Sequence, residues 1–409
     1  MHIGVVDEWL PYPINNGKKS RSFNLLVPLA TQHRITYLAP RGHDANQDRL
    51  AEAELRDRGL SVIWADQHVP LNSGPLFGPR LAANLLSKFP YSVQRHSNSK
   101  LRQAAAKLET TSQVDLWHVE WTPYVHNLRE HVRSPWVINA HNIESLIWRR
   151  YWETEPNLFK AWYIRQQWQK FEAFERAAFR DARCVIATTE CDAELARQHY
   201  GTRTVEVVSN GVDLSHFEFV DKGRNPLELL FLGSLAWRPN LEAVRQLLDT
   251  IFPRIQATEL AARLTIVGLD PPAWLSAQVE RMAGVTLHGS VPDVRPYLAR
   301  CGALLVPLSI GGGSRIKILE ALASGCPVIS TTIGAEGLHL RRGIDYLHVN
   351  KMDEFASATI EGILNYPRLA QTAASGNQVV REQYGWDQLS QKLGAIWESQ
   401  LAKQKVSVA

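Results

Sequence analysis

The sequence predicts an α/β protein built from two doubly wound parallel sheets. Short β-rich runs alternate with helical patterns, as in parallel sheets covered by helices. This alternation starts again midway along the chain, and 409 residues is longer than one hydrophobic core usually grows. We therefore expect two domains, residues 1–205 and 206–387, that meet near residues 205–213. A helix from about residue 388 to 409 is expected to pack back on the first domain.

The predicted strands are runs of β-branched, aromatic and other apolar residues. The first series comprises IGVV from Ile3, ITYLA from Ile35, DLWHVEW from Asp115, WVINAH from Trp136 and CVIATT from Cys184. The second comprises VEVVSNGV from Val205, LELLFLGS from Leu227, ARLTIVG from Ala262, VTLHGS from Val285, ALLVPLS from Ala303 and CPVIST from Cys326. Ligands of open α/β sheets bind beyond the carboxyl ends of strands, so the loops after these runs are candidate sites.

Composition and charge exclude several classes of protein. The chain has 45 basic and 41 acidic residues and a net charge of +4, too close to balance to indicate a nucleic-acid partner. Four cysteines without a CxxC pair predict neither a disulfide framework nor a zinc site. No export signal and no apolar run of about 18 residues is found, which predicts a cytoplasmic protein without a membrane span.

A long helical stretch, residues 144–182, is rich in aromatic and basic residues and is interrupted near Pro156. Apolar residues at helical spacing would form one face packed on the sheet; they are Ile164, Trp168, Phe171, Phe174 and Ala178. The alternative is a membrane-interface patch, as on amphipathic basic helices. Its members would be Trp148, Arg149, Arg150, Trp152, Lys160 and Trp162. This second interpretation would place the protein peripherally at the inner face of a membrane.

Three glycines, residues 311–313, follow the run ALLVPLS and precede a helix expected to begin near Ser314. Glycine permits close approaches that a side chain would block. The start of a helix presents unpaired N–H groups and the positive end of its dipole, to which Arg315 and Lys317 add full charges. This combination predicts a binding site for a diphosphate.

Glu320 lies one turn further along this helix, on the same face as Lys317, whereas Ile316, Leu319 and Ala323 are expected to face the core. A carboxylate in this position can accept hydrogen bonds from a ribose or sugar diol. The alternative is a surface ion pair between Lys317 and Glu320, with the glycines forming a simple turn. The glycine spacing is neither GxGxxG nor a Walker loop, so it does not favour nicotinamide binding or ATP hydrolysis.

Six motifs occur in order along essentially the whole chain: PINNGKKSR, AHNIES, VVSNGVDLSHF, FLGSLAWRPN, LHGSVPDVRPYL and GGGSRIKILEALASGCPVIS. Together they resemble the retaining GT-B glycosyltransferases called glycosyltransferase family 4. The resemblance implies two Rossmann-like domains facing across a cleft. It also implies transfer of a sugar, with retention of anomeric configuration, from a nucleoside diphosphate sugar held by the second domain to a hydroxyl acceptor.

The resemblance assigns roles to residues of the last motif. Glu320 would bind the ribose hydroxyls, and Gly313 and Ser314 would offer backbone N–H groups to the pyrophosphate. Gly312 stands where the family usually has a second glutamate, which puts one contact to the donor sugar in question. The family also commonly places an arginine and a lysine after the strand of FLGS, where this chain has Ser234 and Trp237. We expect Arg315 and Lys317, which we count as catalytic, to supply these missing charges.

Other site residues are also implied mainly by the resemblance. His141 would contact the donor sugar and the reacting centre, although a histidine at a strand end can equally be structural. Asn16 and Gly17 precede a helix with three cations and would approach the donor phosphates, unless those cations form only a solvated face. Ser234, Arg238 and Asn240 would lie near the phosphates, and the backbone at Val294 would meet the nucleobase.

The implied mechanism uses neither a metal nor another cofactor. No DxD-like carboxylate pair accompanies the motifs, and the leaving phosphate would accept the proton of the acceptor, so no enzyme nucleophile is assigned. The expected acceptors are a glycan, a lipid-linked saccharide or a small molecule. Three alternatives stay open, namely a nucleotide-sugar-binding protein with weak or no transferase activity, a GT-B-like sugar-nucleotide epimerase and a Rossmann oxidoreductase.

Overall fold

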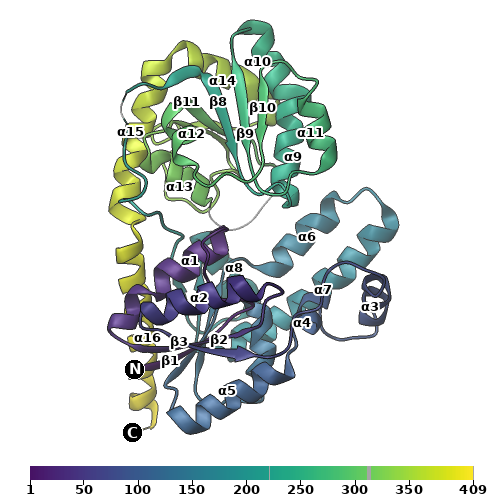
Figure 1. Cartoon of the computed structure of the whole chain (residues 1–409), viewed down its shortest axis with the longest axis vertical. Coiled ribbons are helices and arrows are strands. Elements are labelled where there is room, and N and C mark those ends of the chain that lie inside the picture. The colour runs from purple at the N-terminus through teal and green to yellow at the C-terminus, as the bar shows by residue number, and fades with distance from the viewer. Residues whose placement is uncertain (221, 311–314, 409) are drawn as a thin grey trace. The chain divides into compact units, whose positions relative to one another are not determined.

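The computed structural model describes residues 1–220, 222–310 and 315–408, with side chains described up to residue 402. The chain forms two compact units, coloured in sequence in Figure 1. The N-terminal unit comprises Met1–Ser209 together with the chain from Asp387 onward, and the C-terminal unit comprises Asn210–Trp386.

The described part of the N-terminal unit contains a seven-stranded parallel sheet in the order β3-β2-β1-β4-β5-β6-β7. Its strands are β1 His2–Val6, β2 Arg34–Pro40, β3 Ser61–Ala65, β4 Leu116–Val119, β5 Trp136–Ala140, β6 Cys184–Ala187 and β7 Val205–Val207. The connecting segments are α1 Gly17–Leu26, η1 Pro28–Thr31, α2 Ala45–Asp57, α3 Phe77–Asn84, α4 Tyr91–Arg95, α5 Ser99–Ser112, η2 Thr122–Asn127, α6 Glu144–Thr154, α7 Leu158–Asp181 and α8 Glu190–Tyr200.

The central strands of this sheet are buried on both faces, which explains their nearly continuous apolar sequences. In β1, Ile3 pairs with Ile35 of β2 on one side and with Leu116 of β4 on the other. The neighbouring Gly4 is required by packing, because a Cβ atom at this position would lie 2.6 Å from the ring of Trp117.

The described part of the C-terminal unit contains a six-stranded parallel sheet in the order β10-β9-β8-β11-β12-β13. Its strands are β8 Asn225–Leu232, β9 Arg263–Val267, β10 Val285–His288, β11 Cys301–Val306, β12 Val328–Thr331 and β13 Leu347–Val349. The connecting segments are α9 Arg238–Gln246, η3 Leu247–Ile251, α10 Phe252–Thr258, α11 Ala273–Val279, α12 Arg295–Arg300, α13 Ile316–Ala323, η4 Met352–Glu354, α14 Phe355–Leu364 and α15 Tyr366–Gln383.

The last helix, α16 (Trp386–Val408), returns to the N-terminal unit. The Ser390 hydroxyl donates a hydrogen bond to the carbonyl oxygen of Leu25 in α1 at 2.8 Å. Trp397 is fully buried, and its indole nitrogen lies 3.2 Å from Nδ1 of His118 in β4. The C-terminal helix thus contributes a buried side chain to the N-terminal unit.

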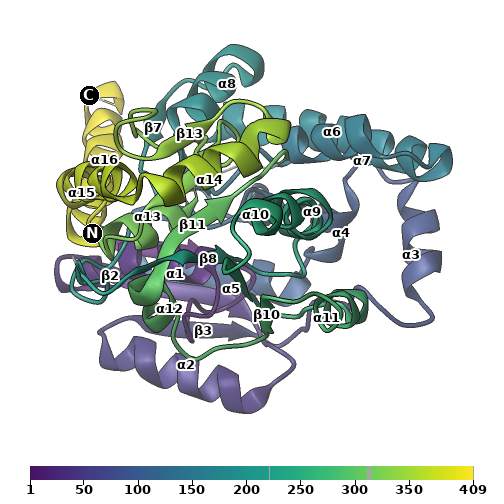
Figure 2. The same ribbon diagram turned by 90° about the horizontal axis from the view of Figure 1, so that it is seen from above.

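The predicted fold class is confirmed, since both units are parallel sheets covered by helices (Figures 1 and 2). One assignment is wrong: the run from Val205 was placed in the second series, but β7 pairs with β6 and is the last strand of the first sheet. The strands β3 and β13 were not predicted. No helix in residues 1–220, 222–310 and 315–408 has the length and apolar character needed to cross a membrane.

Candidate functional site

The C-terminal unit carries the predicted diphosphate site where β11 leads into α13. The helix begins at Ile316, with Arg315 in the N-cap position. Of the three residues expected to face the core, Leu319 and Ala323 are fully buried, whereas Ile316 is half-buried. Gly312, Gly313 and Ser314 lie outside the described residues, so their proposed contacts with the pyrophosphate stay predictions.

Lys317 points from the first turn of α13 to the carboxyl end of β8. Its Nζ atom donates a hydrogen bond to Oδ1 of Asn240 at 3.0 Å and lies 4.7 Å from the ring centroid of Phe231. Asn240 in turn donates to the carbonyl oxygen of Ser234 at 2.8 Å. Gly233 leaves room for the ammonium group, because a Cβ atom there would lie 2.7 Å from Nζ. Lys317 therefore lies at the carboxyl end of β8. The loop after this strand is the one in which the resemblance implies an arginine and a lysine that this chain lacks.

Arg315 is buried beside this lysine. Its guanidinium group lies 5.8 Å from the ring centroid of Trp237, in a cation–π arrangement, and donates a hydrogen bond to the carbonyl oxygen of Ile333 at 3.4 Å. Two cations from one helix start thus converge on the segment between β8 and α9, which is the electrostatic pattern expected of an anion site.

Burial shifts the ionisation of both Lys317 and Glu320, which are half-buried. Desolvation and the nearby charge of Arg315 lower the pKa of Lys317 to about 7, although Glu320 partly opposes this. Desolvation raises the pKa of Glu320 to about 7, and Lys317 offsets part of this rise. The ion pairs within 4.0 Å among the described residues do not include one between Lys317 and Glu320, so the alternative of a surface ion pair is wrong.

The remaining predicted donor residues of this unit surround α9 and α12. Ser234 is exposed directly after β8, and Arg238 is the first residue of α9, 4.0 Å from Glu242 along the same helix. Val294 precedes α12, and its side chain packs against the core of the unit while its carbonyl oxygen accepts the first bonds of the helix. Asn240 links the carbonyl oxygen of Ser234 to the ammonium group of Lys317. The sequence placed this asparagine near the phosphates, but it did not indicate the contact with Lys317.

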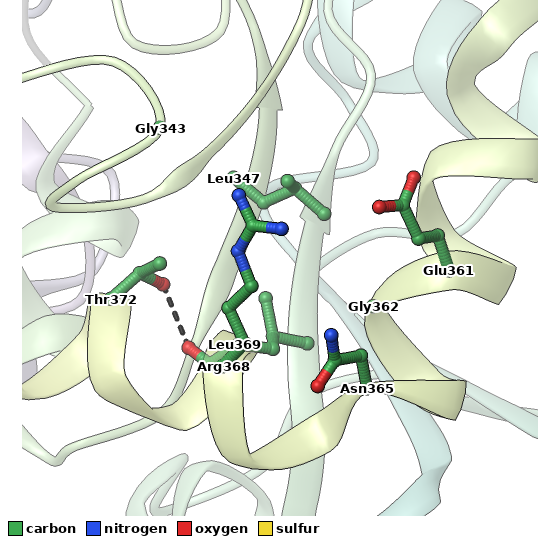
Figure 3. A pocket seen from close by; sticks show the side chains of 8 residues that line it. All are labelled: Gly343, Leu347, Glu361, Gly362, Asn365, Arg368, Leu369 and Thr372. Atoms are coloured by element: carbon green, nitrogen blue, oxygen red, sulfur yellow. Dashed lines mark hydrogen bonds between the residues drawn. The ribbon is translucent and has the colours of Figure 1, made fainter.

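A cavity of about 100 Å³ elsewhere in this unit is not a candidate for the nucleotide site (Figure 3). It lies between β13, α14 and α15, and its lining includes Leu347, Glu361 and Arg368. None of the predicted site residues lines it. Its volume is also well below the roughly 300 Å³ at which small-molecule sites begin.

In the N-terminal unit the predicted glycine loop opens α1 at Gly17. Asn16 caps this helix, and its side chain accepts a hydrogen bond from the backbone N–H of Lys19 at 2.9 Å. Lys18 lies 2.6 Å from Asp7 and 2.8 Å from Glu8, so its charge is balanced within the protein.

The third cation of this helix, Arg21, is fully buried and donates hydrogen bonds to Asn139 at 3.0 Å and to the carbonyl oxygen of Ser209 at 2.8 Å. Two of the three cations expected to attract an anion, Lys18 and Arg21, are therefore engaged within the N-terminal unit.

His141 follows β5, and its Nε2 atom lies 2.9 Å from Oε2 of Glu120, at the end of β4. Burial lowers the pKa of His141, and Glu120 opposes part of this shift. Burial alone would raise the pKa of Glu120, but hydrogen bonds from His118 and His141 outweigh it and hold this pKa well below its usual value. These shifts favour a neutral imidazole at His141 beside an ionised carboxylate at Glu120.

Glu120 was missed by the sequence reasoning, although a signal was present. It stands at the carboxyl end of the predicted strand DLWHVEW, in the position where ligand-facing residues are expected. Asp7 has the same position after β1 and was missed too. The hydroxyl group of Tyr37 and the ammonium group of Lys18 both bond this carboxylate.

Two family models match the chain. The model described as "Glycosyl transferase 4-like domain" matches residues 23–211, and that described as "Glycosyl transferases group 1" matches residues 226–365. A curated relative from Klebsiella pneumoniae, an uncharacterized 44.6 kDa protein in the cps region, is 22% identical over 398 residues, which cover 93% of this chain and 95% of the relative.

Solved structures share the fold at low sequence identity. Sucrose-phosphate synthase from Thermosynechococcus elongatus has a TM-score of 0.74 and 15% identity, with 98% of this chain and 100% of that chain covered. Anabaena HepE in complex with UDP and glucose has a TM-score of 0.66 and 15% identity, with the same coverage. These proteins and the matches to both units agree with the motifs along the chain. The chain belongs to the group 1 glycosyltransferases, the GT4-like enzymes with the GT-B fold.

Proposed function

We propose that this glycosyltransferase moves a sugar from a nucleoside diphosphate sugar to a hydroxyl acceptor with retention of anomeric configuration. The observation that carries the proposal is the convergence of Arg315 and Lys317 at the end of β8, with Glu320 one turn further along α13. The family membership and the UDP and glucose bound to the similar HepE support this assignment.

In the proposed mechanism the diphosphate is the leaving group, and its negative charge grows as the sugar becomes oxocarbenium-like. The two cations and the N-terminus of α13 stabilise this charge, while Glu320 accepts hydrogen bonds from the ribose. The leaving phosphate accepts the proton of the acceptor on the same face of the sugar. His141 contacts the sugar at the reacting centre, and no metal or other cofactor takes part.

The proposal predicts that one nucleoside diphosphate among UDP, GDP, ADP and dTDP raises the melting temperature of the protein. A ligand present at about 100 times its Kd stabilises the native state by about 2.7 kcal/mol. The matching nucleotide sugars should then release nucleoside diphosphate, slowly with water and faster with an acceptor such as a glycan or a lipid-linked saccharide. Binding without turnover of any nucleotide sugar would instead indicate a nucleotide-sugar-binding protein.

The helices α6 and α7 form a hairpin that lies beside α3 in Figures 1 and 2. Two tryptophans of the predicted membrane patch make ring contacts within this hairpin. Trp152 stacks on Trp168 at a centroid distance of 5.2 Å, and Trp148 stacks on Phe171 at 6.0 Å. These two tryptophans are half-buried by their packing within the hairpin.

The exposed apolar residues lie instead at the start of α7, where Leu158, Phe159 and Trp162 are 84%, 88% and 53% exposed. We propose that this tip contacts an anionic lipid surface, with the exposed Lys160 and Arg165 beside it. This would bring the enzyme to a lipid-linked acceptor.

Replacing Leu158 and Phe159 by serine should lower binding to anionic vesicles by about 10-fold or more, since each buried side chain contributes roughly 1.5–3 kcal/mol. Sedimentation with vesicles of phosphatidylglycerol measures this binding. The matched control is Leu260→Ser, because Leu260 is 83% exposed in the C-terminal unit. Equal binding of all three proteins, or no binding by the wild type, would refute the membrane contact.

A further inference from the structure

We propose that Glu120 is a positioning residue that holds His141 as the Nε2–H tautomer, so that Nδ1 accepts a hydrogen bond from a substrate hydroxyl. This inference rests on the proposed function, because it concerns the histidine assigned to the reacting centre. It also gives α16 a part in the site through Trp397. The argument follows the hydrogen bonds from α16 to His141, all of which lie within the N-terminal unit.

The carboxylate of Glu120 is fully buried and accepts hydrogen bonds from four side chains. Oε2 accepts from the Ser22 hydroxyl at 2.7 Å, from the Asn139 amide at 3.1 Å and from His141, while Oε1 accepts from His118 at 2.9 Å. Such a set favours the ionised form, which can only accept hydrogen bonds. Each imidazole must therefore present a protonated nitrogen to Glu120.

Trp397 fixes the tautomer of His118 independently. An indole nitrogen can only donate, so Nδ1 of His118 must accept the hydrogen bond from Trp397 at 3.2 Å. His118 therefore carries its proton on Nε2 and donates it to Glu120. This arrangement orients the carboxylate from the side opposite His141.

The same reasoning applies to His141. Rotating its ring by 180° would place a carbon atom against the carboxylate, so the hydrogen bond from Nε2 selects the observed orientation. In the neutral imidazole Nδ1 is then unprotonated, and among the described residues it has no hydrogen-bond donor. The side chain is 10% exposed, which leaves this nitrogen as the polar atom available to a ligand.

The charged groups that act on His141 are Glu120 from β4 and Lys18 and Arg21 from α1. The carboxylate stabilises the imidazolium form, whereas the two cations and burial oppose it. Neutralising Glu120 should therefore lower the pKa of His141 further. The acid limb of the activity profile, where His141 gains a proton and loses its accepting nitrogen, should move to lower pH.

The test compares Glu120→Gln with the wild type in glycosyl transfer. We expect kcat to fall on the order of 10- to 100-fold, the loss expected for one charge-assisted hydrogen bond, with little change in KM for the donor. The acid limb should shift to lower pH. Glu120→Asp retains the charge and should recover part of kcat together with the wild-type pH profile.

A matched control is Glu109→Gln. Glu109 accepts a hydrogen bond from the indole of Trp117 at 2.8 Å and also bonds Ser134, which places it away from His141. This variant should lose stability without changing kcat or the pH profile. If Glu120→Gln and Glu109→Gln have the same kcat and the same pH profile, Glu120 has only a structural role.

Nitrogen NMR of the histidine rings provides a readout that does not depend on turnover. Wild-type His141 should show a protonated Nε2 and an unprotonated Nδ1 at pH 7, and Glu120→Gln should increase the other tautomer. A proton on Nδ1 in the wild-type protein would overturn the inference even if transfer is observed. Absence of transfer in the wild type would refute the proposed function, whereas the NMR result would still decide the tautomer.

Discussion

Replacing both Arg315 and Lys317 by glutamine is expected to abolish donor binding and to lower kcat/KM by at least about 1,000-fold. The two side chains are the cations that converge on the end of β8, where Lys317 bonds Asn240 at 3.0 Å. Their loss leaves the diphosphate with only the backbone N–H groups of a helix start. Calorimetric titration with the preferred nucleoside diphosphate measures the loss of affinity.

The control for this double variant is Arg245→Gln with Lys351→Gln, which removes the same charge from exposed positions of the same unit. Arg245 lies over the ring of Trp274 at 4.7 Å and takes no part in the proposed site. If both double variants bind the nucleotide equally well, Arg315 and Lys317 do not hold the diphosphate.

The same site has a pH dependence whose sign follows from its two shifted groups. The pKa of Lys317 is lowered to about 7, so the cation is lost as pH rises above this value. The pKa of Glu320 is raised to about 7, so the carboxylate that accepts from the ribose is lost as pH falls below it. Nucleotide affinity should therefore be greatest near neutral pH, and Lys317→Gln should remove the alkaline decline.

His141→Ala is expected to lower kcat by about 100-fold or more, while the affinity for nucleoside diphosphate changes by less than about 10-fold. This histidine belongs to the N-terminal unit, and its proposed contact is with the sugar and not with the nucleotide. Steady-state kinetics and calorimetry on the same preparation separate the two effects. His131→Ala, at an exposed position, should match the wild type.

A loss of nucleotide affinity in His141→Ala with unchanged kcat would contradict this division of labour. It would indicate that His141 contacts the nucleotide. The tautomer of His141 would then have no role at the reacting centre. The result therefore bears on the positioning role of Glu120 as well.

The sequence predicted the elements better than the contacts between them. Helical periodicity and strand runs predicted both sheets and the break near Pro156, because these features depend on neighbours within one segment. The run at Val205 was placed in the wrong sheet, since a three-residue strand gives no local sign of which edge it joins. The strand β13 also has only three residues, whereas β3 was missed although its five residues, Ser61–Ala65, form a mostly apolar run.

In the candidate site, too, the sequence predicted features within one segment but not the contacts between distant segments. The spacing of Lys317 and Glu320 on α13 could be read from the sequence, but the contact of Lys317 with Asn240 joins residues 77 positions apart. The pairing of Glu120 with His141 depends on the adjacency of β4 and β5, which strand order alone determines. Trp148 and Trp152 suggested a membrane patch because their ring partners, Phe171 and Trp168, come from the next helix.

A crystal structure of the protein with its preferred nucleoside diphosphate tests the central claim most directly. We predict that the diphosphate lies at the N-terminus of α13, within hydrogen-bond distance of Lys317 Nζ and the guanidinium group of Arg315. Glu320 should then accept hydrogen bonds from both ribose hydroxyls. A diphosphate bound away from α13, or a ribose with no contact to Glu320, would contradict the proposed function.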